Sequence, residues 1–313
     1  MADKFPALCM TPVSFHEDKS LDEDAIRAHL RRLVATGTAL FLSSGGCGEA
    51  HSLTPKELRK TYDIGVQEGK GKVPVWAALR ESRSAAAMYE IAKEAATAGV
   101  DVIQMYQLDP GHGMIPNERE QEAYWYELLD NIKQPVAISL HYESKYRASV
   151  RFMERLCKRY DQIVGFVLVQ APTAFFYELR AALPDSMKFI CSASEFPERA
   201  PLGATGYVNV SNSFMPYLVR SLGIAWAAGD LAQVSKVHLT LHRFHKIVHQ
   251  WAPSTARWAK MAMKVQGLGN GVIRLPYLLP PEEELRKMAE QFSALGINQF
   301  EAEAKTYVEK AVR

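Results

Sequence analysis

Eight short apolar segments alternate along this chain with longer amphipathic segments, and this alternation limits the fold more than any other feature. The short segments are apolar at consecutive positions, which is typical of parallel strands that are buried on both faces. Strands that alternate with helices predict a parallel sheet with crossover helices between its strands. The predicted strands are residues 7–10, 40–43, 73–77, 102–105, 136–140, 164–169, 189–191 and 207–210.

The longer segments have the spacing of amphipathic helices. In the segment 54–66, Thr54 is suited to cap a helix whose first residue is Pro55. The other predicted helices between strands are residues 21–35, 84–97, 124–132, 150–159, 174–183 and 213–227. After residue 210 the pattern is helical only, with predicted helices at 231–251, 254–265 and 281–295 and a last one from residue 299.

The number of strands favours a (β/α)8 barrel, that is, an α/β TIM barrel, over an open doubly wound sheet. The first predicted strand is not followed by the G-x-G-x-x-G motif of a dinucleotide-binding sheet. An α/β barrel takes about 250 residues as one domain. We therefore predict a barrel over residues 1–228 and a C-terminal helical extension over residues 229–313, packed on the barrel.

Composition and charge indicate a globular protein and argue against a strongly charged partner. The 37 Lys and Arg residues nearly balance the 35 Asp and Glu residues, which argues against nucleic acid or a membrane surface as a partner. The four cysteines are far apart and form no C-x-x-C pair, which is typical of a reducing compartment. We find no leader pattern and no long apolar span, so we expect a cytoplasmic protein.

Several motifs resemble the dihydrodipicolinate synthase / N-acetylneuraminate lyase superfamily. The run Ser44-Gly45-Gly46-Cys47-Gly48-Glu49, followed by Leu53-Thr54, is similar to the G-x-x-G-E…L-T/S signature of that superfamily. The other landmarks follow in the expected order: Thr11-Pro12, Pro135, Ile163-Val164-Gly165, Gly203 to Gly206 and Arg274-Leu275-Pro276. The resemblance covers nearly the whole chain.

The resemblance implies a barrel, commonly tetrameric, that condenses or cleaves 2-oxo acids through a Schiff base on a sixth-strand lysine. This chain departs from that pattern at most of the reactive positions. Val167 stands at the lysine position, and Ser139 stands where a fifth-strand tyrosine would relay protons. The two loop hydroxyls that would hold the carboxylate align with Gly46 and Cys47, and the arginine beyond the fifth strand aligns with Ser144. The tyrosine pair after the fourth strand becomes Tyr106 and Gln107.

The catalytic residues of such barrels lie at the carboxyl ends of the strands, and this rule selects the candidate residues here. As catalytic candidates we take His141 and Tyr142 at the end of the fifth strand, together with Tyr106 and Ser139. As substrate-binding candidates we take Gly46, Cys47, Gly48, Glu49, Arg80, Gln107, Val167 and Asn209.

Most of these candidates also have an ordinary structural interpretation. His141 would then only hydrogen-bond a loop, Glu49 would brace its own loop, and Arg80 would join a surface cluster with Glu81 and Arg83. Cys47 lies among glycines near a helix start, where a thiol pKa falls, but it would equally serve as a small space-filling residue. Two other lysines could supply the amine that is missing at Val167. Lys145 is expected to be a solvated loop residue, and Lys188 is expected at the wrong end of the barrel.

Four histidines, His238, His242, His245 and His249, fall on one stripe of a predicted helix. Histidines at i and i+4 can bind zinc, but neither acidic residues nor thiols stand beside these in the sequence. The stripe predicts either a metal site or a polar contact between helices or subunits.

Two functions from different classes follow. The first is a lyase or hydro-lyase, or an enolising enzyme, that acts on a small 2-oxo or 2-hydroxy acid without a covalent imine. The second is a non-catalytic barrel that binds a metabolite. In both cases we expect no cofactor or metal and neither a nucleic acid nor a membrane partner. The resemblance implies a small carboxylate ligand and a homo-oligomer, either a dimer or a tetramer.

Overall fold

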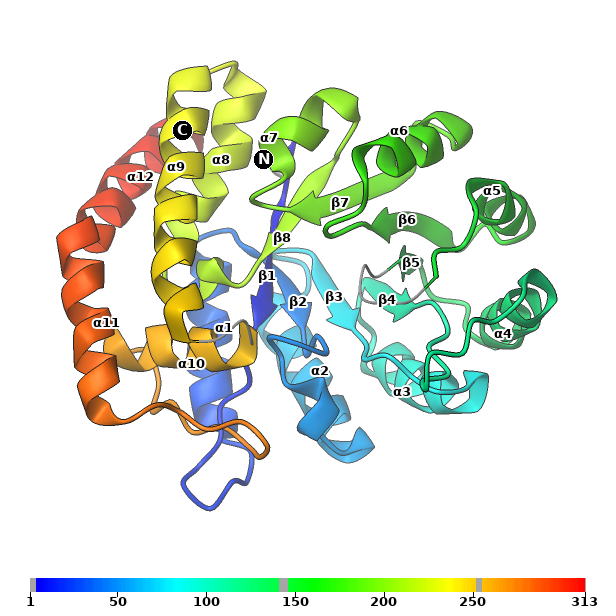
Figure 1. The fold of residues 1–313 in the computed structure, drawn as a ribbon, viewed down its shortest axis with the longest axis horizontal. Helices are drawn as coiled ribbons and strands as arrows, with labels where there is room; N and C mark the ends of the chain where they lie inside the picture. Colours follow the sequence, from blue (N-terminus) through cyan, green and yellow to red (C-terminus); the bar gives the residue numbers. More distant parts are fainter. Residues whose placement is uncertain (1–3, 141–145, 252–254, 313) are drawn as a thin grey trace.

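The computed structural model describes residues 4–140, 146–251 and 255–312, and these form a closed barrel of eight parallel strands ringed by helices (Figure 1). Each strand pairs with the next in the chain, and β1 closes the barrel against β8. The strands are β1 Ala7–Thr11, β2 Ala39–Leu42, β3 Val75–Ala78, β4 Val102–Tyr106, β5 Val136–Ser139, β6 Ile163–Val167, β7 Lys188–Ser192 and β8 Gly206–Asn209. The predicted barrel is confirmed.

Helices lie on the outside of the barrel between successive strands. They are α1 Glu23–Ala35, α2 Pro55–Gly69, α3 Ala85–Ala98, α4 Glu118–Asn131, α5 Val150–Arg159, α6 Thr173–Ala182, α7 Phe196–Arg199 and α8 Pro216–Ala228. The C-terminal helices are α9 Leu231–Val248, α10 Thr255–Val265, α11 Glu282–Leu295 and α12 Ile297–Val312. Short 3-10 turns are η1 Ala50–Ser52, η2 Ala200–Leu202, η3 Ser211–Ser213 and η4 His249–Trp251.

Local capping explains which helices begin at the predicted residue and which begin elsewhere. Thr54 caps α2 as predicted, and its hydroxyl and the Glu57 carboxylate form a reciprocal capping box. Helix α4 begins six residues before the predicted start because Asn117 and Glu120 form the same kind of box. Helix α8 begins at Pro216 and not at Ser213, because the preceding residues form the turn η3.

Two apolar layers explain why the strands are apolar at consecutive positions. Alternate residues of each strand point into the barrel, and the others point toward the helices. The interior layer is Leu8, Ala39, Phe41, Trp76, Ala78, Val102, Ala137, Val167, Ile190 and Val208. Burial of both layers leaves little room for charge on the strands. Among the described strand residues the only charged side chain is Lys188, exposed at the start of β7.

The C-terminal helices pack against the barrel along one side, where α12 lies beside α8 and α9 (Figure 1). The carboxylate of Glu301 in α12 accepts hydrogen bonds from the backbone N–H groups of Tyr217 and Leu218 at the start of α8, at 2.9 and 2.8 Å. These N–H groups have no partner within their own helix, so the carboxylate stabilises the start of α8. The division into two domains at residue 228 stays a prediction. None of the helices in the described ranges is both long and apolar enough to cross a membrane.

Candidate active site

One row of side chains crosses the carboxyl ends of three neighbouring strands. Tyr106 at the end of β4 pairs in register with Ser139 at the end of β5, and Ser139 pairs with Val167 at the end of β6. All three are less than 9% exposed. The Ser139 hydroxyl lies 3.4 Å from the carbonyl oxygen of Val167. The structure therefore brings together three of the predicted site residues at the end of the barrel where such barrels carry their chemistry.

Val167 occupies the position at which the resemblance predicts the reactive lysine. Its side chain belongs to the interior layer of the barrel and is 4% exposed. The predicted inward orientation of this position is thus observed, and an apolar group fills it. A valine has no amine with which to form an imine.

Lys188, one of the two lysines considered as a replacement, lies at the opposite end of the barrel from this row. Lys188 is exposed at the amino end of β7, and its Nζ lies 6.0 Å from the centre of the Trp76 ring, beside an open depression at the bottom of the barrel. The expectation that Lys188 lies at the wrong end of the barrel is confirmed. Lys145 lies outside the described residues.

His141 and Tyr142, the main catalytic candidates, and Ser144 also lie outside the described residues. The segment that follows them is held by residues after β4. Gln107 donates from Nε2 to the carbonyl of Tyr146 at 2.8 Å, and the Tyr146 hydroxyl donates to the carbonyl of Leu108 at 2.6 Å. Burial raises the pKa of the Tyr146 hydroxyl, so the group stays protonated as a donor. Gln107 was expected to bind substrate, and here it joins the loops that follow β4 and β5.

The loop between β2 and α2, residues 43–54, has a compact backbone. The amide of Gly48 donates to the Ser44 hydroxyl at 3.2 Å, and a Cβ at position 48 would lie 2.4 Å from the Ser44 nitrogen. Ser43 and Glu49 both have positive φ, at 54° and 52°. Only a residue without a side chain fits at position 48, so this glycine fixes the loop geometry.

Two of the predicted binding residues, Arg80 and Cys47, have structural partners in or near this loop. Arg80 donates from Nη1 to the carbonyls of Ala50 and Leu53, at 2.8 and 3.0 Å, so it braces the loop and does not form the expected cluster with Glu81 and Arg83. Cys47 is 2% exposed, and its Sγ lies 3.9 Å from Sδ of Met10.

Asn209 is the one predicted binding residue that the register turns away from the barrel interior. It alternates with Val208, which belongs to the interior layer, and it pairs with Cys9 on the outer face of β1. Its Oδ1 accepts from the amide of Ser211 at 2.6 Å. Asn209 therefore caps the turn after β8.

A buried ion pair that the sequence analysis missed anchors the same loop. Nζ of Lys260, on α10, lies 2.9 Å from Oε2 of Glu49, and these residues are 4% and 0% exposed. Lys260 also donates to the carbonyl of Val272 at 2.8 Å and lies over the Phe15 ring. Burial raises the pKa of Glu49 and lowers that of Lys260, and the opposite charge of the partner counteracts each shift. The available signal was a single lysine among Trp258, Ala259, Met261 and Ala262 in a predicted helix.

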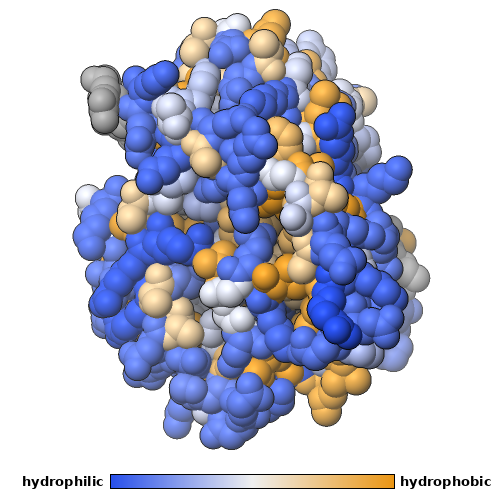
Figure 2. Space-filling model, turned by 90° about the vertical axis from the view of Figure 1, so that its left-hand side faces the viewer, coloured by the Kyte–Doolittle hydropathy of each residue, from blue (hydrophilic) through white to orange (hydrophobic). Residues whose placement is uncertain are grey.

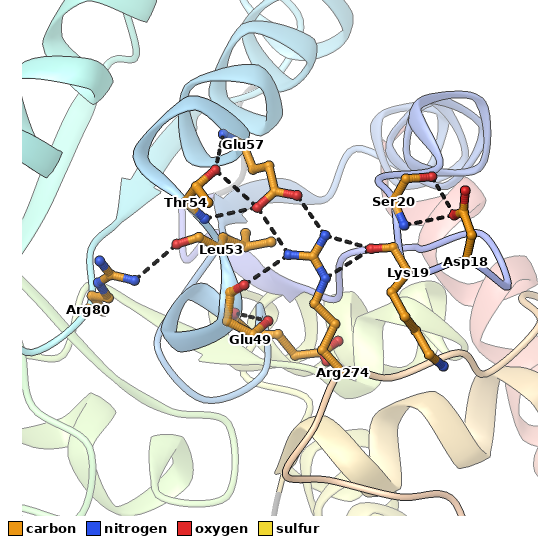
Figure 3. A network of polar contacts seen from close by, with 10 residues as sticks. Asp18, Lys19, Ser20, Glu49, Leu53, Thr54, Glu57, Arg80 and Arg274 are labelled. Carbon is orange, nitrogen blue, oxygen red and sulfur yellow. Dashed lines mark hydrogen bonds and ion pairs between the residues drawn. The ribbon is translucent and has the colours of Figure 1, made fainter.

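Arg274 ties the C-terminal extension to the loop from the other side (Figure 3). Its guanidinium donates to both carboxylate oxygens of Glu57, to the Ser52 carbonyl and to the Lys19 carbonyl. The hydrogen bonds from Arg274 hold the pKa of the Glu57 carboxyl at about 2. Together with Lys260, Arg274 makes the C-terminal extension part of the support of the site.

The four histidines lie as two pairs along α9 and the turn η4 that follows it. Nε2 of His238 lies 3.1 Å from Nε2 of His242, and the rings of His245 and His249 are stacked at 5.7 Å. Burial lowers the pKa of His245 to about 4. Within the described ranges, three or more His, Cys, Asp or Glu residues nowhere gather in an arrangement that could hold a metal ion. A role for the stripe at a subunit contact stays a prediction.

Sequence comparison gives a family model, described as the Dihydrodipicolinate synthetase family, that matches residues 6–295. The 4-hydroxy-tetrahydrodipicolinate synthase of Methylibium petroleiphilum is 26% identical over 287 residues, which cover 90% of this chain and 94% of that relative. The corresponding enzyme of Methanopyrus kandleri is 23% identical over 300 residues, covering 93% and 95%.

Solved structures with the same fold include proteins described as dihydrodipicolinate synthases or as members of that family. Dihydrodipicolinate synthase from Aquifex aeolicus has a TM-score of 0.84 at 20% identity, covering 94% of this chain and 98% of its own. A prophage protein of the dihydrodipicolinic acid synthase family from E. coli K12, in complex with pyruvate, also has a TM-score of 0.84, at 19% identity, covering 94% and 99%. These likenesses extend over the barrel and the C-terminal helices.

Proposed function

The chain belongs to the dihydrodipicolinate synthetase family, and we propose that within this family of lyases it acts on a small 2-oxo or 2-hydroxy acid without a covalent imine. The observation that carries the proposal is Val167, which fills the inward position on β6 beside Ser139. A protonated imine stabilises a carbanion at the adjacent carbon, and a valine cannot form one. Dehydration, hydration or enolisation therefore suits this site better than aldol cleavage.

The remaining parts of the site have the following proposed roles. The substrate carboxylate is held by backbone amides of Gly46 and Cys47 in the loop after β2, with Arg80 beside that loop. The Gly48 amide takes no part, because it donates to the Ser44 hydroxyl. Backbone N–H groups bind oxyanions without help from hydroxyl side chains, which are absent at Gly46 and Cys47. His141 or Tyr142, which follow β5 in the sequence, would transfer the proton.

Borohydride trapping with pyruvate tests the absence of an imine. We expect the intact mass of the protein to stay unchanged after reduction, while pyruvate raises the melting temperature. A relative that retains the sixth-strand lysine serves as the positive control. Val167→Lys is the matched variant, and an adduct at position 167 alone would show that pyruvate reaches the row formed by Tyr106, Ser139 and Val167.

Two results would contradict the proposal. A reduced adduct on a native lysine, located by peptide mapping, would restore a Schiff-base mechanism. The peptide that contains Lys260 would be inspected first, because Lys260 is the one buried lysine among the described residues. If no 2-oxo or 2-hydroxy acid changes the melting temperature, the substrate class is wrong.

A non-catalytic metabolite-binding barrel is the second candidate function. It is favoured by the joint replacement of three reactive positions, which hold Val167, Ser139 and Ser144 in this chain. In that case His141→Ala would leave ligand binding and every measured rate unchanged, whereas the enzyme would lose rate without loss of stability.

We also propose that the protein is a homo-oligomer, a dimer or a tetramer. The face formed around α11 and α12 is mainly hydrophilic, with apolar side chains interspersed (Figure 2). Large exposed apolar side chains occur in four parts of the described chain: Met114 and Ile115, Tyr177, Leu231 and Leu239, and Leu275 and Leu278. Scattered single apolar residues occur on most protein surfaces and do not mark an interface, so the proposal rests on the family and the molar mass in solution decides the number of subunits.

A further inference from the structure

A glutamine lies inside the barrel, and neither end of its carboxamide is hydrogen-bonded to any residue that the structure describes. Gln104 is in the middle of β4 and is 0% exposed. Neither Nε2 nor Oε1 has a hydrogen-bond partner among the described residues. Because Val102, two residues earlier, belongs to the interior layer, the alternation of the strand directs Gln104 to the same interior.

Small residues flank Gln104 on both neighbouring strands. It pairs in register with Ala78 on β3 and with Ala137 on β5, and Ala137 pairs in turn with Gly165 on β6. The two alanines carry only a methyl group and the glycine has no side chain. At the level of Gln104 on these strands, no long side chain therefore contacts the carboxamide. The next row toward the carboxyl ends of the strands is Tyr106, Ser139 and Val167, about 7 Å away along β4.

An unpaired carboxamide in an apolar interior costs free energy, because both of its polar ends have lost water without gaining a protein partner. A leucine of similar size would avoid this cost at the same position. The cost of burying this glutamine is offset when a bound molecule forms hydrogen bonds with its carboxamide. A second buried carboxamide, Asn212, follows β8 at the carboxyl ends of the strands, and it too has no hydrogen-bond partner at either end among the described residues.

We propose that Gln104 contacts the substrate and selects small acids with a hydroxyl or carbonyl oxygen next to the carboxylate. The inference rests on the proposed function and deepens it. An oxygen at that carbon accepts a hydrogen bond from Nε2, and a hydroxyl also donates to Oε1. Because Gln104 is neutral and the described strands hold no charged group near it, this part of the site suits a neutral oxygen and not the carboxylate.

Three acids that differ at one carbon test the proposal. Pyruvate, lactate and propionate carry a carbonyl, a hydroxyl and a methylene next to the same carboxylate. Their dissociation constants are measured by calorimetry for the wild type and for Gln104→Leu. We expect the wild type to bind pyruvate or lactate with a dissociation constant about tenfold or more below that of propionate. The variant should bind all three acids with similar dissociation constants.

Thermal melting without ligand supplies the second readout. Gln104→Leu removes an unpaired polar group, so we expect its melting temperature to rise by about 2 °C or more. Gln121→Leu is the matched control. Its Nε2 donates to the Pro116 carbonyl at 3.0 Å, so its replacement leaves that carbonyl unpaired and lowers the melting temperature.

The outcomes separate the inference from the proposed function. If the three acids bind and Gln104→Leu keeps the wild-type preference, the inference is wrong and the proposed function stands. If Gln104→Leu melts lower, as Gln121→Leu does, Gln104 is a structural residue that binds an internal water, and the inference is also wrong. If none of the acids binds the wild type, the proposed function fails and the inference falls with it.

Discussion

Lys260→Met is expected to lower the free energy of unfolding by about 3–5 kcal/mol, because it leaves the buried Glu49 carboxylate without its cation. Glu49 is 0% exposed, and the Lys260 Nζ lies 2.9 Å from its Oε2. Urea unfolding followed by circular dichroism measures the loss. Such a loss would also loosen the loop after β2, which we propose holds the substrate carboxylate, so ligand affinity would fall as well.

Two controls separate the buried ion pair from the loss of a lysine as such. Lys264→Met removes a lysine from the same helix, where it lies 2.7 Å from the exposed carboxylate of Glu282, and should cost less than about 1 kcal/mol. The double variant Glu49→Gln with Lys260→Met should recover part of the loss, because no charge then stays buried. Equal losses for Lys260→Met and Lys264→Met would show that the Glu49–Lys260 pair is not buried in solution.

The loss in Lys260→Met should also depend on pH. Burial raises the pKa of Glu49, and the variant lacks the positive charge that opposes this rise. The folded variant then binds a proton more tightly than the unfolded chain, so its stability increases as the pH falls. The deficit relative to wild type should therefore be larger at pH 8 than at pH 5.

Gly48→Ala is expected to destabilise the protein by about 3 kcal/mol, at the upper end for overpacking. The added Cβ would lie 2.4 Å from the Ser44 nitrogen and 2.5 Å from the Ser43 Cα. Both are backbone atoms of the same loop, so no side-chain rotation relieves the clash. The loop must change its path, and we expect the Gly48 amide to lose its hydrogen bond to Ser44.

Gly269→Ala is the matched control for this substitution. A Cβ at position 269 would have the Met263 side chain 3.8 Å away as its nearest neighbour, which is an ordinary contact. Its effect on stability should stay within about 0.5 kcal/mol, as for other exposed positions. If Gly48→Ala is equally mild, the loop after β2 adopts a different conformation in solution.

The register of the strands explains why the central part of the site could be predicted. Consecutive apolar residues and the turns between them give the order of the strands, and parallel neighbours then align their carboxyl ends. Val167 and Ser139 therefore become neighbours through local pattern alone. The same reasoning places Lys188 at the opposite end, since it begins its strand.

Contacts between distant segments could not be predicted in this way. Arg80 was expected at a substrate or in a surface cluster, but its direction depends on the path of the loop after β2, which positive φ angles at Ser43 and Glu49 determine. Gln107 was expected to bind substrate, but its partner is a carbonyl on a loop that follows another strand. A side chain's partner depends on backbone placed by the whole barrel.

The sequence by itself determined the barrel, the C-terminal helices and the apolar residue at the sixth-strand position, because periodicity and register act over short stretches of chain. Only the tertiary structure decided that Lys260 neutralises Glu49 and that Gln104, inside the barrel, has no partner among the residues placed by the structure. Whether a buried polar group finds a partner depends on which distant atoms close around it, and the periodicity of one strand or helix carries no information about those atoms.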